Sequence, residues 1–143
     1  MTVGKDCFIG DPVFIREGVT IGDHTIIGTF VAIESNAKIG NNVTIQPFSI
    51  IAKDMVVEDN VFLGPHFSCA DAPYVADGEH GLSKNKKSVP QKTIVIKEDS
   101  RLGTRCTVAP GVTIGHHSFI KMNCQIYKDV PPNTILPAGT IWK

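Results

Sequence analysis

The sequence has no excess of charge of either sign and no long apolar run. Its 143 residues contain 14 Lys and Arg against 14 Asp and Glu, so the formal net charge is zero. This balance gives no electrostatic basis for binding nucleic acid or an anionic membrane surface. Purely apolar stretches extend over a few residues, far short of the roughly 20 that a membrane-spanning helix needs. We therefore expect neither a nucleic-acid partner nor a membrane partner.

The N-terminal stretch, MTVGKDCFIGD, lacks the basic start and apolar run of a signal peptide. We therefore expect a cytoplasmic protein. The length suits a single domain covering residues 1–143. The four cysteines form no CxxC pair, so reduced and buried thiols are expected rather than a disulfide framework or a metal cluster. Such thiols also fit a reducing compartment.

Large aliphatic residues recur at every sixth position. A second series, four residues after each aliphatic, is mostly small or β-branched. This period excludes an amphipathic α-helix, because the aliphatics would spread around every helical face. The main series is Val3, Ile9, Ile15, Ile21, Ile27, Ile33, Ile39, Ile45, Ile51, Val57 and Leu63, and it resumes in a shifted frame as Ile96, Leu102, Val108, Ile114, Ile120 and Ile126.

Each hexapeptide reads as one short strand followed by a turn. Two inward side chains per strand fill a narrow prism, and Gly or Asn relieves the tight corner. Three such strands complete one coil, so residues 18 apart stack at the spacing of a parallel sheet, about 4.8 Å. The sequence therefore predicts an all-β, left-handed parallel β-helix. Cys7, Cys106 and Cys124 take the small inward position and Cys69 the large one.

One long loop, about residues 70–92, interrupts the repeat and follows the strand after His66. Long excursions from a rigid scaffold are usually functional or disordered. The prism interior is filled by side chains, so a ligand must bind outside it. We expect the cleft to lie where the loop meets a neighbouring subunit.

Outward positions differ between the three predicted faces. The face of Gly18, Asn36 and Asp54 is polar, and the face of Phe8, Ile26, Thr44 and Phe62 is mixed. The remaining face is apolar and predicts a subunit interface, with a homotrimer as the leading assembly. Packing of this face against the chain's own loop is the alternative. Its outward residues are Pro12, Phe30, Phe48 and His66, beside Phe14, Ala32, Ile50 and Ser68.

Three stretches resemble the hexapeptide-repeat acyltransferases, and among them the nucleotide-sugar amine N-acetyltransferases: VFLGPHFSCADAPY, KTIVIKEDSRLGTRCTVAPGVTIGHHSFI and YKDVPPN. The resemblance covers nearly the whole chain. It implies acetyl-coenzyme A as the donor, a nucleotide-linked amino sugar as the acceptor, a homotrimer, and active sites between subunits. The chain departs from that branch at Asp71, where Asn is usual, and at its ending, LPAGTIWK.

The residues that border the loop are the catalytic candidates: His66, Asp71 and His80, with Glu79 beside it. Acyl transfer from a thioester needs an unprotonated amine or hydroxyl held in line with the carbonyl. A hydroxyl acceptor needs a general base, which would be His66. An amine acceptor needs chiefly positioning, and Asp71 would hold the ammonium or its proton.

The resemblance also implies a coenzyme-binding set. Gly103, Ala109 and Gly111 would lie along the pantetheine arm, with Lys121 and Lys128 near the phosphates. The alternatives are an O-acetyltransferase of a sugar or small molecule, and a trimeric scaffold without activity.

A metalloenzyme similar to the γ-class carbonic anhydrases is a further alternative, because that class shares the fold. The adjacent His116 and His117 would point in different directions, and no HxxxxH spacing occurs. We therefore expect no metal site.

Overall fold

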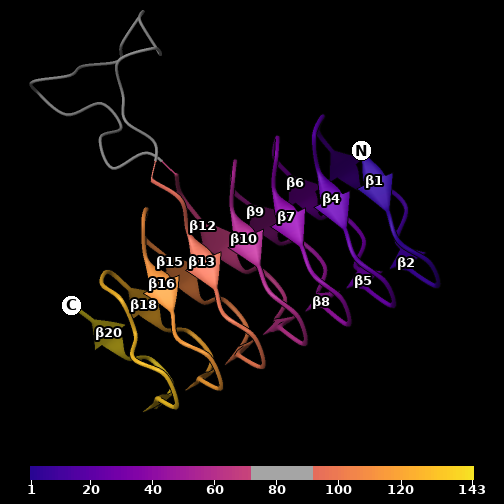
Figure 1. Cartoon of the computed structure of the whole chain (residues 1–143). Helices are drawn as coiled ribbons and strands as arrows, with labels where there is room; N and C mark the ends of the chain where they lie inside the picture. Colours follow the sequence, from indigo (N-terminus) through magenta and orange to yellow (C-terminus); the bar gives the residue numbers. More distant parts are fainter. Residues whose placement is uncertain (72–91) are drawn as a thin grey trace, which may run out of the picture.

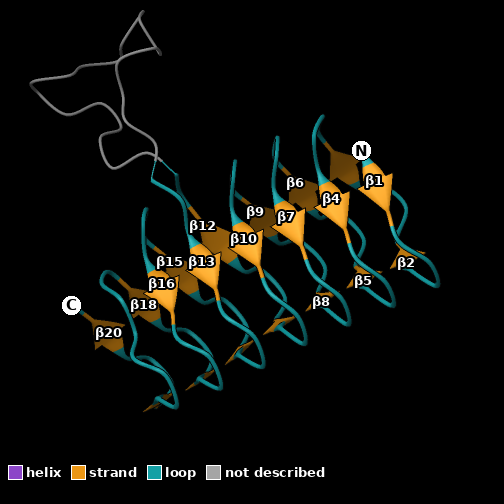
Figure 2. Cartoon of the chain, in the orientation of Figure 1, coloured by secondary structure: helices purple, strands orange, loops and turns teal. Residues whose placement is uncertain are grey.

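A computed structural model describes residues 1–71 and 92–143 (Figure 1). Every regular element in these residues is a short parallel strand, and the chain winds as a solenoid of stacked coils (Figure 2). This confirms the predicted left-handed parallel β-helix. Across the described ranges, no helix has the length and apolar character needed to cross a membrane.

The strands form three faces, joined by turns at edges that we call AB, BC and CA. Face A consists of β1 (Thr2–Val3), β4 (Thr20–Ile21), β7 (Lys38–Ile39), β10 (Val56–Val57), β13 (Val95–Ile96) and β16 (Thr113–Ile114). Face B consists of β2 (Phe8–Ile9), β5 (Ile26–Ile27), β8 (Thr44–Ile45), β11 (Phe62–Leu63), β14 (Arg101–Leu102), β17 (Phe119–Ile120) and β19 (Ile135–Leu136). Face C consists of β3 (Phe14–Ile15), β6 (Ala32–Ile33), β9 (Ile50–Ile51), β12 (Ser68–Cys69), β15 (Thr107–Val108), β18 (Gln125–Ile126) and β20 (Ile141–Trp142).

Backbone hydrogen bonds hold successive coils in register. Before the loop, paired residues lie 18 positions apart, as Thr2 pairs with Thr20. The loop enters between β12 and β13 without breaking the stack, because Val56 then pairs with Val95 across it. The loop therefore leaves the solenoid at edge CA (Figure 1).

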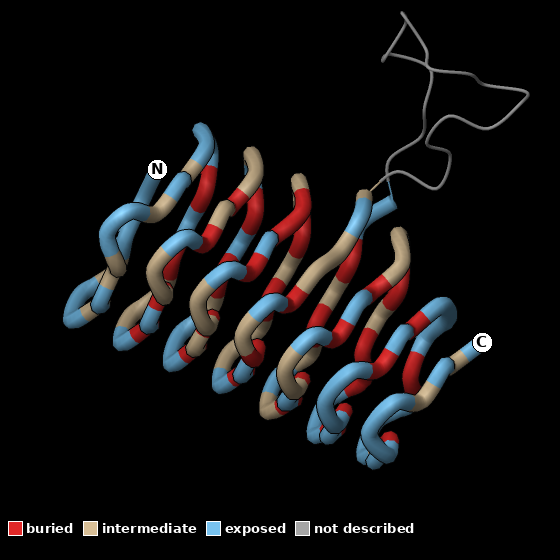
Figure 3. The backbone as a smooth tube through the Cα atoms, turned by 180° about the vertical axis from the view of Figure 1, so that it is seen from behind, coloured by how far each residue is buried: buried red, intermediate tan, exposed pale blue. Residues whose placement is uncertain are grey.

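The inward positions form one continuous core. The large series is fully buried through the middle coils, as at Ile45, Leu63 and Leu102, and buried residues recur along the coils (Figure 3). In the small series, hydroxyls donate to turn carbonyls of the next coil: Thr25 Oγ1 to Gly40 O and Ser100 Oγ to Gly115 O, both at 2.9 Å. These bonds satisfy polar groups that would otherwise be costly to bury.

Turns at all three edges contain residues with positive φ, and the types of residue at these positions differ between the edges. Edge AB uses residue types that tolerate this conformation. They are Asp6, His24, Asn42, Asn60, Asp99, His117 and Asn133. Edge BC has His66, Asn123 and Gly139 there, but it also places Phe30, Phe48 and Arg105 in this conformation, with φ between 59° and 63°. For the Phe and Arg side chains the left-handed region costs about 1–2 kcal/mol each.

The large side chains of edge BC stack on one another. Phe30 and Phe48 lie 5.3 Å apart between ring centroids, and Phe48 and His66 lie 5.1 Å apart, both nearly parallel. The predicted stack is therefore present, but in the turns rather than on a flat face. Phe14 lies beside it on face C, paired with Ala32.

The last coil is shorter than the others. Phe119 pairs with Ile135, 16 positions on, and Ile114 bridges to Val130, so two residues are missing at edge CA. The ending LPAGTIWK still continues the solenoid through β20, where Trp142 Nε1 donates to Asp129 O at 3.0 Å.

All four cysteines are free, and they hold the inward positions predicted for them. Cys106 and Cys124 are buried, whereas Cys7 and Cys69 are partly exposed, contrary to the expectation that all would be buried. Cys7 belongs to the first coil, and Cys69 stands at the base of the loop. Burial raises the pKa of the Cys69 thiol to about 12 and that of Cys106 to about 11.

These raised values predict selective thiol labelling. The thiolate is the reactive form, so at pH 8 iodoacetamide should modify Cys7 first and leave Cys69 and Cys106 almost unlabelled in the folded protein. Peptide mass spectrometry after brief labelling measures this order, with urea-unfolded protein as the control in which all four react. Rapid labelling of Cys106 in folded protein would contradict the burial described above.

Candidate functional site

The apolar outer surface is concentrated on one side of the prism. Face B exposes Phe8, Ile26, Phe62, Phe119 and Ile135; edge BC exposes Phe30, Phe48 and Met122; and face C exposes Phe14, Ile50 and Ile141. Face A presents none of the exposed large apolar side chains among its outward residues. Face B is thus more apolar than the mixed face that its first coils predicted.

Face B carries a groove made of two joined hollows. The first, of about 440 Å³, is lined by Asn42, Thr44, Asn60, Val61, Phe62, Arg101, Leu102, Gly103 and Phe119. The second, of about 380 Å³, is lined by Phe62, Pro65, Gly103, Thr104, Phe119, Lys121, Met122 and Ala138. The shared residues Phe62, Gly103 and Phe119 join the hollows into one groove that runs obliquely from edge AB to edge BC.

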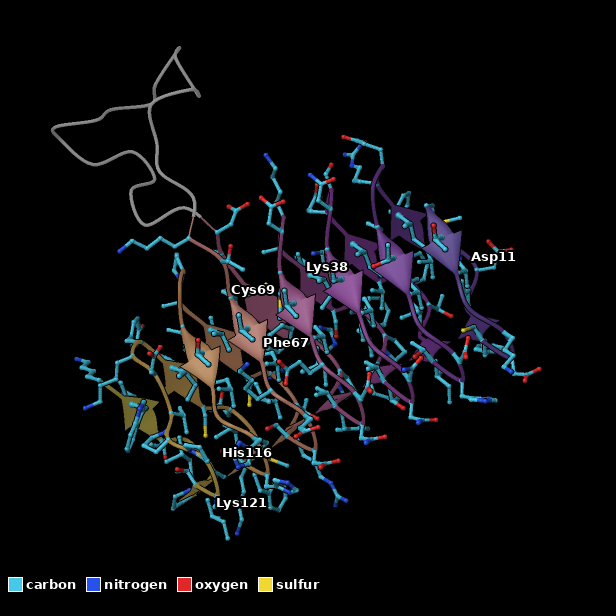
Figure 4. The ribbon with its side chains drawn as sticks, viewed as in Figure 1. Asp11, Lys38, Phe67, Cys69, His116 and Lys121 are labelled. Atoms are coloured by element: carbon cyan, nitrogen blue, oxygen red, sulfur yellow. The ribbon has the colours of Figure 1, made fainter. Side chains whose placement is uncertain are left out.

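The two ends of the groove differ in chemistry. The edge AB end is polar, with Asn42, Asn60 and Arg101, and the edge BC end is almost wholly apolar around Met122. The charged residues of the lining are Arg101 and Lys121, both cationic, and no carboxylate lines either hollow. Figure 4 shows Lys121 at the outer side of the C-terminal coils. A chain of zero net charge therefore has a locally cationic groove.

The predicted coenzyme-binding residues separate into two groups. Gly103 and Lys121 line the face B groove. Ala109, Gly111 and Lys128 lie at edge CA, on the far side of face C. Gly111 has φ of 76°, so any side chain there would be strained, and its turn packs on Lys92.

Lys128 is engaged within the same chain, since its Nζ lies 5.0 Å from the centroid of the Trp142 ring. Gly103 has a tight contact of its own, because a Cβ there would come within 2.7 Å of the Met122 nitrogen.

The catalytic candidates also lie apart. His66 is exposed in the turn before β12, at edge BC, and Asp71 follows β12 at edge CA. The five residue steps between them span at most about 16 Å, and the two side chains lie at opposite ends of β12, on different edges of the prism. Asp71 O accepts the Lys92 N–H at 2.9 Å. His80 and Glu79 lie outside the described residues.

His116 and His117 form no converging pair. Their rings meet edge to face at 5.2 Å, and His117 Nε2 lies 3.4 Å from Asp99 Oδ2. Within residues 1–71 and 92–143, no three His, Cys, Asp or Glu side chains gather in a way that would hold a metal ion.

Two segments of the chain match known repeat families. Residues 1–35 match the family described as "Bacterial transferase hexapeptide (six repeats)", and residues 93–128 match "Hexapeptide repeat of succinyl-transferase". Together with the coils described above, these matches identify the repeat unit. The chain is built from hexapeptide repeats of the kind that these two transferase families describe.

One curated relative of this hexapeptide-repeat protein is the Escherichia coli protein named "Putative colanic acid biosynthesis acetyltransferase WcaF". It is 30% identical over 73 residues, which is 51% of this chain. The match spans 40% of the relative's own length.

Two solved structures share the fold. A mutant of AntD, an N-acyltransferase from Bacillus cereus in complex with dTDP and coenzyme A, superposes with a TM-score of 0.82 at 17% identity, over 94% of this chain and 77% of that one. A mutant perosamine N-acetyltransferase from Caulobacter crescentus, in complex with coenzyme A and GDP-perosamine, gives a TM-score of 0.69 at 19% identity, over 90% and 52%.

Sequence reasoning did not find Arg101, Phe62 and Phe119 as groove residues of this hexapeptide-repeat protein. The signal was present, since all three are outward residues of face B and pair in register across the loop. If the series of outward residues on face B had been continued past the loop, where the repeat shifts its frame, Phe62, Arg101 and Phe119 would have aligned on successive coils.

Proposed function

We propose that this protein transfers an acetyl group from acetyl-coenzyme A to the amino group of a nucleotide-linked sugar. The observation that carries the proposal is the face B groove, which combines an apolar centre with two cationic residues and no carboxylate. A ligand with a long uncharged arm and phosphate groups matches that pattern. The proteins of known structure described above, which bind coenzyme A together with a nucleotide or a nucleotide sugar, support it.

The coenzyme lies in the edge BC half of the groove in this proposal. Its uncharged arm packs against the apolar lining around Phe119 and Met122, beside Gly103. Lys121 is positioned to meet a phosphate. We also propose a cytoplasmic location. The four cysteines are free, as expected in a reducing compartment, and both proposed substrates are cytoplasmic molecules.

Filling this half of the groove should weaken coenzyme binding. Ala138 is exposed and lines the apolar hollow, so Ala138→Trp should weaken coenzyme A binding at least about tenfold by steric exclusion. Isothermal titration calorimetry measures the change. Thr20→Trp, an exposed position on face A, is the matched control and should bind normally. An unchanged dissociation constant in Ala138→Trp would show that the coenzyme does not bind in this groove.

We further propose a homotrimer in which edge BC lies near the three-fold axis. Face B of one subunit then meets face C of the next, because a three-fold interface joins two different surfaces. This arrangement covers the apolar side chains of both faces and leaves the polar face A in solvent. It also brings the edge AB half of the groove, with Asn60 and Arg101, opposite edge CA of the neighbour, which carries Asp71.

Phe30→Asp tests this assembly. The position is half-exposed, and a fully buried Phe contributes about 1.5–3 kcal/mol, so a charge near the axis should yield monomers. The fold itself should survive, because Asp adopts positive φ more readily than Phe. Asn36→Asp has φ of 62° at edge CA of the same coil and should leave the trimer intact. Sedimentation velocity distinguishes the two, and a trimeric Phe30→Asp would refute the interface.

The transfer itself joins the acceptor nitrogen to the acetyl carbon and breaks the thioester bond. The amine loses a proton, and the coenzyme leaves as a thiol or thiolate. His66 follows Pro65, which lines the groove, so it borders the donor directly. We propose that His66 positions an amino sugar, or acts as the general base if the acceptor is a hydroxyl, while Asp71 of the neighbouring subunit holds the acceptor's ammonium.

His66→Asn and Asp71→Asn separate these roles when each is assayed with acetyl-coenzyme A and a panel of nucleotide amino sugars. For a base, turnover should fall by about 10²–10⁴ in His66→Asn. If the acceptor is an amine held by Asp71, turnover should fall further in Asp71→Asn than in His66→Asn. Phe48 stacks on His66, and Asn tolerates the same φ, so neither variant should unfold. Full activity in both variants would exclude these residues.

A further inference from the structure

Arg101 occupies a distinctive place on face B. It is the outward residue of β14 and pairs in register with Phe62 on one side and Phe119 on the other. The two rings are 37% and 44% exposed, so they form walls that remain open to a ligand. Parallel strands hold these three side chains about 4.8 Å apart along the column. Arg101 thus lies in register between two ring-bearing residues, and its planar guanidinium is pre-organised to bind two oxygens of a ligand.

The charge around Arg101 favours an anion. Its own hollow contains no carboxylate, and two acidic side chains of the adjoining edge AB, Asp99 and Asp59, have other partners. Asp99 lies 3.4 Å from the His117 imidazole, and Asp59 Oδ1 accepts the Asn41 N–H at 2.8 Å. None of the ion pairs between described residues uses Arg101. The guanidinium therefore faces the groove without a competing negative charge in the lining.

The neighbours of Arg101 add hydrogen-bond donors for several oxygens. The side chains of Asn42, Asn60 and Thr44 line the same hollow. Positive φ in the turns fixes the backbone of both asparagines at edge AB. A planar guanidinium binds two oxygens of a phosphate at once, and amide and hydroxyl donors satisfy the others. A single carboxylate would leave most of these donors unused, whereas a diphosphate uses them.

We propose that Arg101, with Asn42 and Asn60, is a diphosphate-binding site on face B. The inference rests on the proposed function and assigns the residues that hold the diphosphate of its nucleotide-linked acceptor. The apolar half of the same groove, from Phe62 to Ala138, is left for the acyl donor. Both nucleotide sugars and coenzyme A contain a diphosphate, so the test must separate these two sources.

Calorimetric titration with UDP, dTDP and GDP, and separately with coenzyme A, makes that separation on the full chain. Arg101→Gln should lower nucleoside diphosphate affinity at least about tenfold and leave coenzyme A affinity unchanged. Arg101→Lys retains the positive charge but cannot bind two oxygens at once. Its affinity for nucleoside diphosphates should therefore lie between those of the unmodified protein and Arg101→Gln. Arg16→Gln, an exposed arginine of face C paired with Glu34 at 3.7 Å, is the control.

Each outcome has one meaning. Loss of nucleoside diphosphate binding alone assigns the site to the acceptor. Loss of coenzyme A binding alone supports the diphosphate site but assigns it to the donor. Unchanged affinity for all ligands in Arg101→Gln overturns the inference, and the proposed function then stands if acetyl transfer persists. Absence of coenzyme A binding in the unmodified protein would instead refute the proposed function. Thermal unfolding of each variant confirms that the outward substitution leaves the fold unchanged.

Discussion

The backbone register between successive coils is the constraint on which the rest of the structure depends. Each coil is bonded to the next through its strands and also through its turns, as when the His24 N–H donates to Lys5 O at 2.9 Å. Side chains that are a full coil apart in sequence therefore become neighbours in space. The core, the stack on edge BC and the column of Phe62, Arg101 and Phe119 are all consequences of this one register.

The narrow interior accounts for much of the sequence. Only two side chains per strand enter the prism, and their sizes are limited by the other two faces. Where a polar side chain enters, as at Ser49, its hydroxyl donates to a turn carbonyl instead of remaining unpaired. Cys106 makes the same kind of bond, to Lys121 O at 3.2 Å, so the buried cysteines act as serine substitutes as well as small apolar groups.

The fold was largely predictable from the sequence because a buried position must be apolar or small in every coil. That rule located the inward residues on both sides of the loop, including Leu102 after the frame shift. It did not reveal the shortened last coil, because Ile126 is followed six positions later by Pro132 and the bridging residue is Val130. It also placed Phe30 and Phe48 on a face instead of in the turns of edge BC, since general turn preferences favour Gly and Asn at such positions.

The candidate site was less predictable, because outward residues are free to vary and carry no period. Gly103 and Lys121, which the family resemblance named, line the face B groove, and their binding role stays a prediction. Arg101 required knowledge of which strands pair across the loop. The separation of His66 from Asp71 is likewise a property of the turns, which direct the two ends of β12 to different edges.

The base of the loop has a consequence for how such a protein can change. The Lys92 N–H donates to Asp71 O, and Lys92 O accepts the Gly111 N–H at 3.2 Å, so both ends of the insertion are tied to the coil pattern. Lys92 therefore joins the coil before it to the coil after it through its own backbone. The connection between positions 71 and 92 can then change in length, in evolution or by engineering, while the prism keeps its register.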